Sequence, residues 1–535
     1  MLIESPKATV TRPHVSAGSP KPALIIALLC LPALLFVWLN RDVPHFGVLQ
    51  DDGLYFGSAK TLAEGSGYRV ASIPTAPAQT KYPPLYPLLL SLAWRIHPSY
   101  PANLSIALLL SWMCLPVVLG LIYQWCRRHG FAAPVPWLVT GLFALNPYVL
   151  FFTSNLVSEV FFMVFLFGAI WAAEHPDGRG WKWPLLAGGI AGAAFLARTA
   201  GIALLPAAVV YYLWKRNYRG ALWFLAGMLP AVAGWTLWTH GYAAPGRDVV
   251  TMSYTNYVAY QFYNVGWDNF GQVLWNNVDA LLLAMGSLVF PQMLVGLPAK
   301  LILEPLGIAM ILGCVRMSRK HGSLLYPLFG AISLAMLVVW HFQPNQRFIL
   351  PVAPLLLTGF CFEMAHLAGL FRTAFHHKDR SQRVVAYGFA GVLGLILLCG
   401  AGLQVYMDAR VMPEIARTDR SNGAQFGRLY QWISKNLPAN AAVMWESDTA
   451  LYFGSGHPAT NYVVPPREWY ASGGDDGVAT RYQKVAAFAR QHHLDYVGIT
   501  KIGLQRNEDA LRVMAANPAL ERVYEDSSAI LYRVR

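Results

Sequence analysis

The stretch PALIIALLCLPALLFVWL, residues 22–39, decides the fold. It carries no charged side chain, and roughly 20 apolar residues are enough for a helix to cross the hydrocarbon core of a membrane. Lys7, Arg12 and Lys21 precede it, but no small-residue cleavage site follows. This combination favours a retained signal anchor over a removed signal peptide. We therefore expect the chain to enter a membrane here.

The composition of the whole chain agrees with this expectation. Of 535 residues, 55% are hydrophobic and only 13% are charged, about half the charged share of a soluble domain. The net charge of +13 comes from short basic clusters between apolar runs, as in cytoplasmic loops, so we expect no nucleic acid partner. The six cysteines lie in or beside apolar runs without paired spacing, which predicts neither a disulfide framework nor a zinc site.

Further apolar runs follow along the chain. We expect about eleven transmembrane helices, near 22–39, 103–125, 133–149, 156–174, 183–198, 199–215, 221–240, 297–315, 322–341, 348–371 and 384–406. Two other apolar stretches, 84–97 and 279–294, are short or bounded by proline. We expect these two to be helices that lie along the membrane surface.

Basic residues predict the sidedness of these crossings. With eleven crossings, every basic turn falls on the side of the N-terminus: Arg127–Arg128, Arg179 to Lys182, Lys215 to Arg219, Arg316 to Lys320 and Arg372 to Arg383. Cytoplasmic loops carry an excess of Lys and Arg. The N-terminus is therefore expected in the cytoplasm and the C-terminus outside the cell membrane.

Three regions follow from this topology. Residues 1–21 are expected to be a flexible cytoplasmic tail, and residues 22–407 a transmembrane domain with outer loops 40–102 and 241–296. Residues 408–535 alternate β-like runs (441–445, 494–500, 529–534) with helical patterns (422–437, 479–491, 505–517). This alternation predicts a small extracytoplasmic α/β domain without an acid–base cluster of its own. No internal repeat stands out in the sequence.

The stretch DDGLYFGSAKTLAE, residues 51–64, places two carboxylates just beyond the first crossing. Helix capping explains such a pair on its own, because Asp is a preferred N-cap residue and negative charge is favoured at a helix N-terminus. Other charged residues are expected on the same outer face, and they favour a chemical role for Asp51, with Asp52 mainly capping the helix.

Three of these outer charges are candidates for chemistry. Lys81 precedes two prolines in TKYPPLYPLLL, Glu159 ends NLVSE at the outer end of a crossing, and Arg347 lies in HFQPNQRFILPVAP. Lys81 and Arg347 alone fit interfacial anchors whose charged ends reach water. A carboxyl such as Glu159 inside the hydrocarbon layer is costly and usually faces a polar cavity or a partner.

Aromatic residues also gather in the outer loops. Tyr254, Tyr257, Tyr260 and Tyr263 follow one another at a spacing of three, which fits either an ordinary aromatic belt or one wall of a sugar or lipid site. The candidate substrate-binding residues are Tyr55, Tyr82, Tyr257, Tyr260 and Gln346.

The order of these motifs resembles that of a known family. Asp-acid-x-x-Tyr at 51–55, the Tyr-Pro-Pro-Leu helix start, NP…SE in a crossing, LARTAG and QRFILPVAP together resemble the C-type (GT-C) glycosyltransferases. The resemblance is greatest to the branch that holds the protein O-mannosyltransferases and the lipid A aminoarabinose transferases. It covers residues 40–370 well and the C-terminal domain more loosely.

The resemblance implies an enzyme that uses a polyprenyl-phosphate sugar, with Asp51 as the catalytic base and Lys81 at the donor phosphate. Glycosyl transfer needs a carboxylate to take the acceptor's hydroxyl proton, and the departing phosphate needs cations, for which Lys81 and Arg347 are the candidates. Glu159 is expected to position the base or the acceptor. We expect an inverting transferase without a metal cofactor, although Asp51, Asp52 and Glu159 together could bind a divalent ion.

The expected partners are the lipid-linked donor, membrane lipids and an acceptor that is a lipid, a glycan or a protein. The expected location is a bacterial inner membrane. Two other classes remain open: a transporter or flippase for a lipid-linked sugar, and a non-catalytic cell-envelope assembly protein. Transporters tend to show paired repeats and broken helices with sites at the midplane, and the sequence shows neither.

Overall fold

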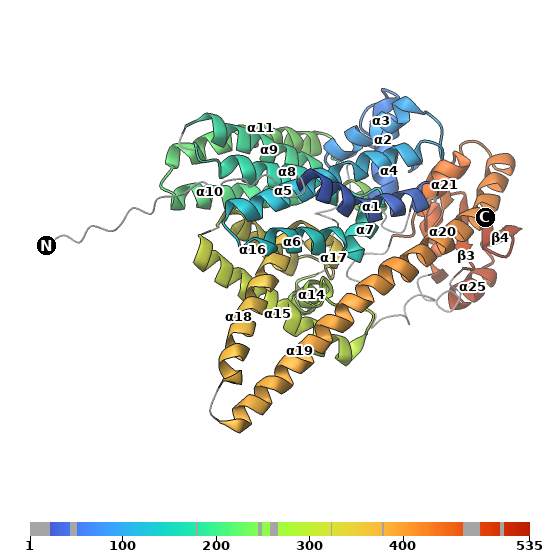
Figure 1. Ribbon diagram of the computed structural model, residues 1–535. Coiled ribbons are helices and arrows are strands. Elements are labelled where there is room, and N and C mark those ends of the chain that lie inside the picture. Colours follow the sequence, from blue (N-terminus) through green and yellow to red (C-terminus); the bar gives the residue numbers. More distant parts are fainter. Residues whose placement is uncertain are drawn as a thin grey trace.

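We analysed a computed structural model of the chain (Figure 1). The structure describes residues 22–42, 46, 51–177, 180–243, 249–256, 260, 266–322, 324–376, 379–463, 482–502 and 508–535. Helices form most of the molecule, and a small sheet lies at its C-terminal end.

Within these residues, six helical segments are long and apolar enough to cross a membrane. They are α1 (Pro22–Asn40), α4–α5 (Leu104–Trp112 and Cys114–Arg128), α11 (Tyr218–Gly241), α15 (Gly296–His321), α17–η3–α18 (Gln346–Ile349, Leu350–Val352 and Ala353–Phe375) and the segment that begins with α19 (Arg380–Tyr406). Each coincides with one of the expected crossings.

The other expected crossings are helices too, but shorter or bent. The pair α6 (Pro134–Ala144) and α7 (Pro147–Thr153) bends by 57° and counts as a seventh span if it is taken as one. The shorter apolar helices at expected crossings are α8 (Glu159–Ala173), α9 (Lys182–Ala197), η1–α10 (Thr199–Ala203 and Leu204–Trp214) and α16 (Leu325–Val338). The chain is therefore a polytopic α-helical membrane protein.

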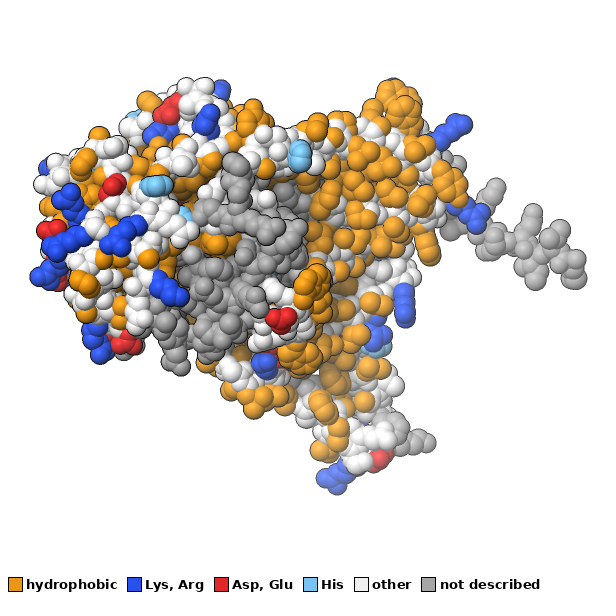
Figure 2. All heavy atoms as spheres, turned by 180° about the vertical axis from the view of Figure 1, so that it is seen from behind, with side chains coloured by type: hydrophobic (Ala, Val, Ile, Leu, Met, Phe, Trp, Pro, Cys, Tyr) orange, Lys and Arg blue, Asp and Glu red, His pale blue; other side chains and the backbone are white. Residues whose placement is uncertain are grey.

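The surface of these helices is apolar. Large hydrophobic side chains point outward on α10, α11 and α19, where Trp214, Leu237 and Leu398 are 75%, 73% and 72% exposed. Figure 2 shows apolar side chains covering one broad part of the molecule, whereas charged side chains gather on another part and at the tips. A surface of this kind is stable in lipid and not in water.

The ends of the helices sort by charge as the sequence predicts. The C-terminal ends of α5, α8 and α15 meet: His129 of the α5 end lies 3.5 Å from Glu174, and His321 of α15 contacts the His129 carbonyl at 3.1 Å. The basic residues Arg127, Arg128 and Arg316–Lys320 thus belong to one end of the bundle. The N-terminal end of α8, with Glu159, lies at the opposite end.

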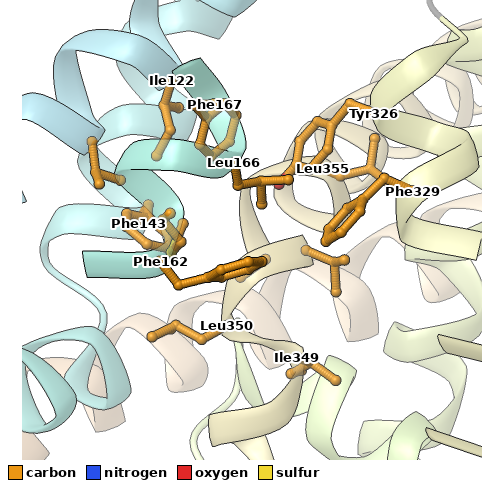
Figure 3. Close-up of a cluster of buried hydrophobic side chains, with 14 of the residues drawn as sticks. Ile122, Phe143, Phe162, Leu166, Phe167, Tyr326, Phe329, Ile349, Leu350 and Leu355 are labelled. Atoms are coloured by element: carbon orange, nitrogen blue, oxygen red, sulfur yellow. The ribbon is translucent and has the colours of Figure 1, made fainter. Parts of the chain in front are cut away.

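A buried apolar core packs α6 and α8 against α16. Phe143 and Phe162 come from α6 and α8, and Tyr326 and Phe329 come from α16 (Figure 3). α15 and α18 also cross at very short range, because a Cβ added at Gly313 would lie 1.8 Å from the carbonyl oxygen of Gly359. Close backbone approach at small residues is a usual means of packing helices in membranes.

Other elements lie outside the crossings. They are α2 (Asp51–Ala63), α3 (Leu85–Ile96), α12 (Val249–Thr255), η2 (Trp267–Asn269) and α14 (Phe270–Ser287). α3 is the apolar helix expected at 84–97. The helix expected at 279–294 is wrong in its bounds: it begins at Phe270 and ends at Ser287, because the amphipathic residues before Asp279 extend it and Pro291 follows its end.

The last expected crossing continues without interruption into the C-terminal region. α19, a π-helical turn (Met407–Val411) and α20 (Met412–Asn436) form one segment of 57 residues, so the helix expected at 422–437 is the end of α20. The expected boundary at residues 407 and 408 therefore lies inside continuous helix.

A five-stranded sheet follows, as expected for a small α/β domain. Its strands are β1 (Val443–Met444), β2 (Ala459–Thr460), β3 (Tyr496–Thr500), β4 (Leu520–Glu525) and β5 (Ala529–Val534), in the order β2-β1-β3-β5-β4. β1 is parallel to β2 and β3, whereas β5 is antiparallel to β3 and β4. The domain's helices include α21 (Asp448–Ser455), α24 (Val485–Gln491) and α25 (Glu508–Ala515). The three expected strands are confirmed as β1, β3 and β5.

Candidate active site

Arg347 occupies the centre of a buried charge cluster. Asn345 caps the short helix α17, because its side chain accepts a hydrogen bond from the Arg347 amide at 3.0 Å. The next turn is anchored in the core by Ile349 and Leu350, which are fully buried (Figure 3). The Asn345 cap before Arg347 and the buried Ile349 and Leu350 after it fix the backbone that carries Arg347. The Arg347 side chain is only 8% exposed.

Glu159 lies on one side of that guanidinium. It opens α8 and is fully buried, and it accepts a hydrogen bond from the Arg347 Nε. Arg198, at the C-terminal end of α9, pairs with the same carboxylate at 2.6 Å. With Asp51, which also pairs with Arg347, the cluster holds two carboxylates and two arginines, and removing one partner would leave a buried charge uncompensated.

Arg198 is a residue that sequence reasoning missed. It stands in the LARTAG motif and ends an expected crossing on the outer side, in the same position relative to the membrane as Glu159. An arginine and a glutamate expected at the same depth were a usable signal for a pair.

Asp51 lies on the other side of Arg347. Its Oδ2 is 2.7 Å from an Arg347 nitrogen, and its Oδ1 accepts a hydrogen bond from the Tyr82 hydroxyl. The Asp51 side chain is 21% exposed. Arg347 therefore bridges the first outer loop and α8 through two carboxylates, only one of which reaches the surface.

Asp52 behaves differently from its neighbour. It is fully buried, and its Oδ1 accepts a hydrogen bond from the Gly53 amide at 2.7 Å. Its charge is thus turned toward the first turn of α2, where exposed amides and the helix dipole favour an anion. Of the two adjacent carboxylates, Asp51 is the one that faces the cluster.

Lys81 is a second cation beside Asp51. Burial lowers the pKa of Lys81 to about 8, while the Asp51 carboxylate opposes that shift. For Asp51, burial raises the pKa, but the charges of Arg347 and Lys81 outweigh it and the net pKa is lowered. At neutral pH the site therefore holds an ionised Asp51 beside a protonated Lys81.

Two tyrosines line the carboxylate. The rings of Tyr55 and Tyr82 lie 4.7 Å apart, and the Tyr55 hydroxyl meets Ser158 at 3.1 Å. Tyr55 sits one turn after Asp51 on α2, and Tyr82 directly follows Lys81. Aromatic faces beside a carboxylate are suited to the apolar face of a sugar ring.

The other expected substrate-binding residues are Gln346, Tyr260 and Tyr257. Gln346 donates hydrogen bonds to Ser287 at 3.0 Å and to Gln292 at 3.1 Å, so its amide faces α14. Tyr260 is buried, at 8% exposure. Tyr257 lies outside the described residues.

No group of three or more His, Cys, Asp and Glu side chains suited to a metal ion occurs in the described part of the chain. Asp51 and Glu159 do approach a common cation, but that cation is the guanidinium of Arg347. A metal ion shared by these two carboxylates would need Arg347 to move away.

The described cluster can perform one kind of chemistry well. A partly exposed carboxylate at a helix N-terminus can accept a proton, and two cations beside it can stabilise a departing anion. Tyrosine rings border the same carboxylate.

Comparisons with known proteins define the fold. No protein-family model and no curated protein matches the sequence. The architecture is that of the C-type glycosyltransferase fold. The solved structures with this architecture include ArnT from Cupriavidus metallidurans bound to undecaprenyl phosphate, with a TM-score of 0.54 at 15% identity, covering 96% of this chain and 98% of that one. ArnT from Cupriavidus metallidurans in the apo state gives a TM-score of 0.52 at the same identity and coverage.

Proposed function

We propose that the protein is an inverting glycosyltransferase that takes a sugar from a polyprenyl-phosphate donor and transfers it to an acceptor hydroxyl. The observation that carries the proposal is the position of Asp51, a partly exposed carboxylate held between Arg347 and Tyr82 beside a second cation, Lys81. The fold supports it, because ArnT, a lipid A aminoarabinose transferase, shares the architecture and was crystallised with undecaprenyl phosphate.

Asp51 is the proposed base. As the acceptor oxygen attacks the anomeric carbon, its proton passes to the Asp51 carboxylate and the bond between that carbon and the phosphate oxygen breaks. The electron pair of the broken bond leaves with the polyprenyl phosphate. Attack on the face opposite to the leaving phosphate inverts the anomeric configuration.

Lys81 is the proposed partner of the donor phosphate. It stands close enough to Asp51 for each charge to shift the pKa of the other group. Arg347 adds positive charge to the same site, but its first role in the proposal is to hold Asp51 in the orientation needed for proton transfer. Glu159 and Arg198 fix Arg347 from behind, since Glu159 contacts both arginines.

Tyr82 is proposed to contact the transferred sugar, because its hydroxyl bonds the reacting carboxylate. Tyr55 is only 3% exposed and supports the Tyr82 ring, whose centre lies 4.7 Å away. The enzyme would work at the outer face of a bacterial inner membrane, with the N-terminus in the cytoplasm. The donor is a polyprenyl-phosphate sugar, and the acceptor is a lipid, glycan or protein that carries a free hydroxyl.

The test is transfer of label from a radiolabelled polyprenyl-phosphate sugar to an acceptor, using purified full-length protein in lipid vesicles. We expect label to leave the donor and to appear in a new product, with undecaprenyl or decaprenyl phosphate released. Movement of intact donor between leaflets without release of the phosphate would identify a flippase and contradict the proposal.

A further inference from the structure

A short sequence at the start of α2 recurs in the C-terminal domain. Residues 51–58 read DDGLYFGS, and residues 448–455 read DTALYFGS. Both copies form helices that begin at the aspartate, α2 and α21. The expectation that the chain contains no internal repeat is therefore wrong at this scale, because a match of this length is too short to be noticed as a repeated domain.

The two helices pack directly against each other. A Cβ added at Gly53 would lie 2.0 Å from the Thr449 hydroxyl, and one added at Gly57 would lie 3.7 Å from the Phe453 ring. Both pairs advance by one helical turn in the same direction, so α2 and α21 run parallel. Parallel packing places the two N-terminal ends, with Asp51 and Asp448, at the same end of the pair.

Apolar contacts stabilise the packing of α21 against α2 and its neighbours. The Phe453 ring lies 5.6 Å from Phe56 and 5.9 Å from Trp94, and both belong to a buried cluster that also contains Leu451 and Trp445. The cluster thus combines side chains of the first outer loop with side chains of the C-terminal domain. The two parts of the chain share one core here.

The loop that carries Lys81 spans the distance between the two aspartates. On one side, the Tyr82 hydroxyl donates to Asp51. On the other side, the Thr80 hydroxyl donates to the Thr255 carbonyl at 2.5 Å, and the neighbouring Tyr254 donates its hydroxyl to Asp448. Lys81 stands between Thr80 and Tyr82 in the chain, and the charges of Asp51 and Asp448 both act on its ammonium.

Asp448 is suited to this position. It is 8% exposed, and its Oδ1 accepts a hydrogen bond from the Thr449 amide at 2.7 Å. Burial raises its pKa to about 6, and the Tyr254 hydrogen bond and the Lys81 charge oppose that shift. The C-terminal domain thus supplies a titratable group to this end of the molecule.

We propose that Asp448 is a positioning residue of the transferase site, which shares the Lys81 ammonium with Asp51 and holds it toward the donor phosphate. The inference rests on the proposed function and adds to it, because the C-terminal domain then completes the donor site. Among the described residues, Arg347, whose charge opposes the protonation of Lys81, and His341, whose ring is within range of the Lys81 charge, also act on Lys81.

The test is the pH dependence of undecaprenyl phosphate binding to full-length protein in detergent, between about pH 6 and pH 10, where Lys81 titrates. Asp448→Asn removes a carboxylate that raises the pKa of Lys81. We therefore expect binding to weaken by about tenfold at neutral pH, the loss of one charge-assisted contact. We also expect the alkaline loss of binding to begin at lower pH than in the wild type.

Two control variants distinguish a role of Asp448 in positioning Lys81 from a general role in the stability of the domain. In Lys81→Arg the cation stays charged over this range, so adding Asp448→Asn should leave the alkaline side of the profile unmoved. Asp526→Asn is the matched control: Asp526 lies in the same domain and also accepts a tyrosine hydroxyl, from Tyr524 at 2.8 Å. It should leave the profile unchanged.

A folded Asp448→Asn protein with the wild-type alkaline profile would overturn the inference. If that variant does not fold, Tyr254→Phe takes its place, since it keeps the carboxylate and removes the hydrogen bond that lowers the pKa of Asp448. We then expect binding on the acid side to be lost at higher pH, and an unmoved acid side would overturn the inference. A wild-type protein that binds no undecaprenyl phosphate would instead refute the proposed function itself, and the inference with it.

Discussion

At the scale of single residues, the site depends on a buried Glu159 that forms ion pairs with two arginines. Glu159 is fully buried, and Arg198 and Arg347 are 15% and 8% exposed. Breaking a buried ion pair by removing one partner leaves uncompensated charge in a medium that solvates it poorly. Glu159 therefore contributes to stability as well as to the position of Arg347.

We predict that Glu159→Gln destabilises the protein by roughly 3–5 kcal/mol. Glu363→Gln is the matched control, because Glu363 pairs with Arg316 at 2.6 Å but Arg316 is 45% exposed and can be solvated after the change. Thermal unfolding in detergent should show a large fall of the apparent Tm for Glu159→Gln and a small one for Glu363→Gln. Equal falls in the apparent Tm of the two variants would show that Glu159 contributes no more to stability than the partly solvated Glu363–Arg316 ion pair does.

The same cluster predicts how the protein responds to chelators. Arg347 already stands between Asp51 and Glu159, the carboxylates that a divalent ion would need. We therefore predict that EDTA leaves sugar transfer unchanged. The measurement is turnover with and without EDTA, and loss of activity that Mg²⁺ or Mn²⁺ restores would replace the two-cation site with a metal site.

At the scale of elements, the contact between α2 and α21 sets the position of the proposed base. Gly53 lies two residues after Asp51, and any side chain there would collide with Thr449. Thr449 is fully buried and cannot turn away into solvent. The contact therefore allows glycine alone at position 53.

We predict that Gly53→Ala lowers both the apparent Tm and the rate of transfer, because α2 must move away from α21. Thr449→Gly should restore much of both in the double variant, since it removes the colliding atoms and costs only about 0.3 kcal/mol in helix propensity relative to Thr. Gly57→Ala is the control, because its Cβ would meet Phe453 at an ordinary 3.7 Å. A double variant as impaired as Gly53→Ala alone would show that the collision is not the cause.

Much of the element structure could be predicted from sequence. Apolar runs of membrane length identify helices because a spanning segment has to satisfy its own backbone hydrogen bonds. The ends were less predictable: nothing local distinguishes the end of α19 from the start of α20, and the helix simply continues through Met407–Val411. β2 has two residues, too few to form a pattern.

Part of the site could also be predicted, because the apolar runs predict the membrane topology. Asp51, Lys81, Glu159 and Arg347 could be grouped because topology puts them on one face of the membrane. The contact of Asp448 with this group could not be foreseen, since it depends on how a domain some four hundred residues away in sequence packs on α2. Membrane topology predicts on which side of the membrane a residue lies, whereas its contacts depend on how the helices and domains pack.

At the scale of the whole molecule, the orientation in the membrane decides where the site faces. The charge cluster lies at the end of α8 opposite to the basic turns, and cytoplasmic loops are the basic ones. The site and the C-terminal domain are therefore predicted to lie outside the cytoplasm.

Single cysteines in a variant that lacks the six native ones test this orientation. Ser381 is the second residue of α19 and Ala516 directly follows α25, and both positions are exposed. In cells whose inner membrane is intact, a membrane-impermeant thiol reagent should label Ala516→Cys and should label Ser381→Cys only after lysis. The opposite labelling pattern would show that the membrane topology is inverted and that the site faces the cytoplasm.

The central claim is that Asp51 is the base of a polyprenyl-phosphate-dependent sugar transfer, and label transfer from a radiolabelled polyprenyl-phosphate sugar by Asp51→Asn tests it most directly. Asn is nearly the same size and still caps helices, so the variant should fold, but it cannot accept a proton. We predict a fall in turnover of about a hundredfold or more for Asp51→Asn, with a smaller effect for Asp52→Asn. Wild-type turnover by Asp51→Asn, or a large loss confined to Asp52→Asn, would contradict the account.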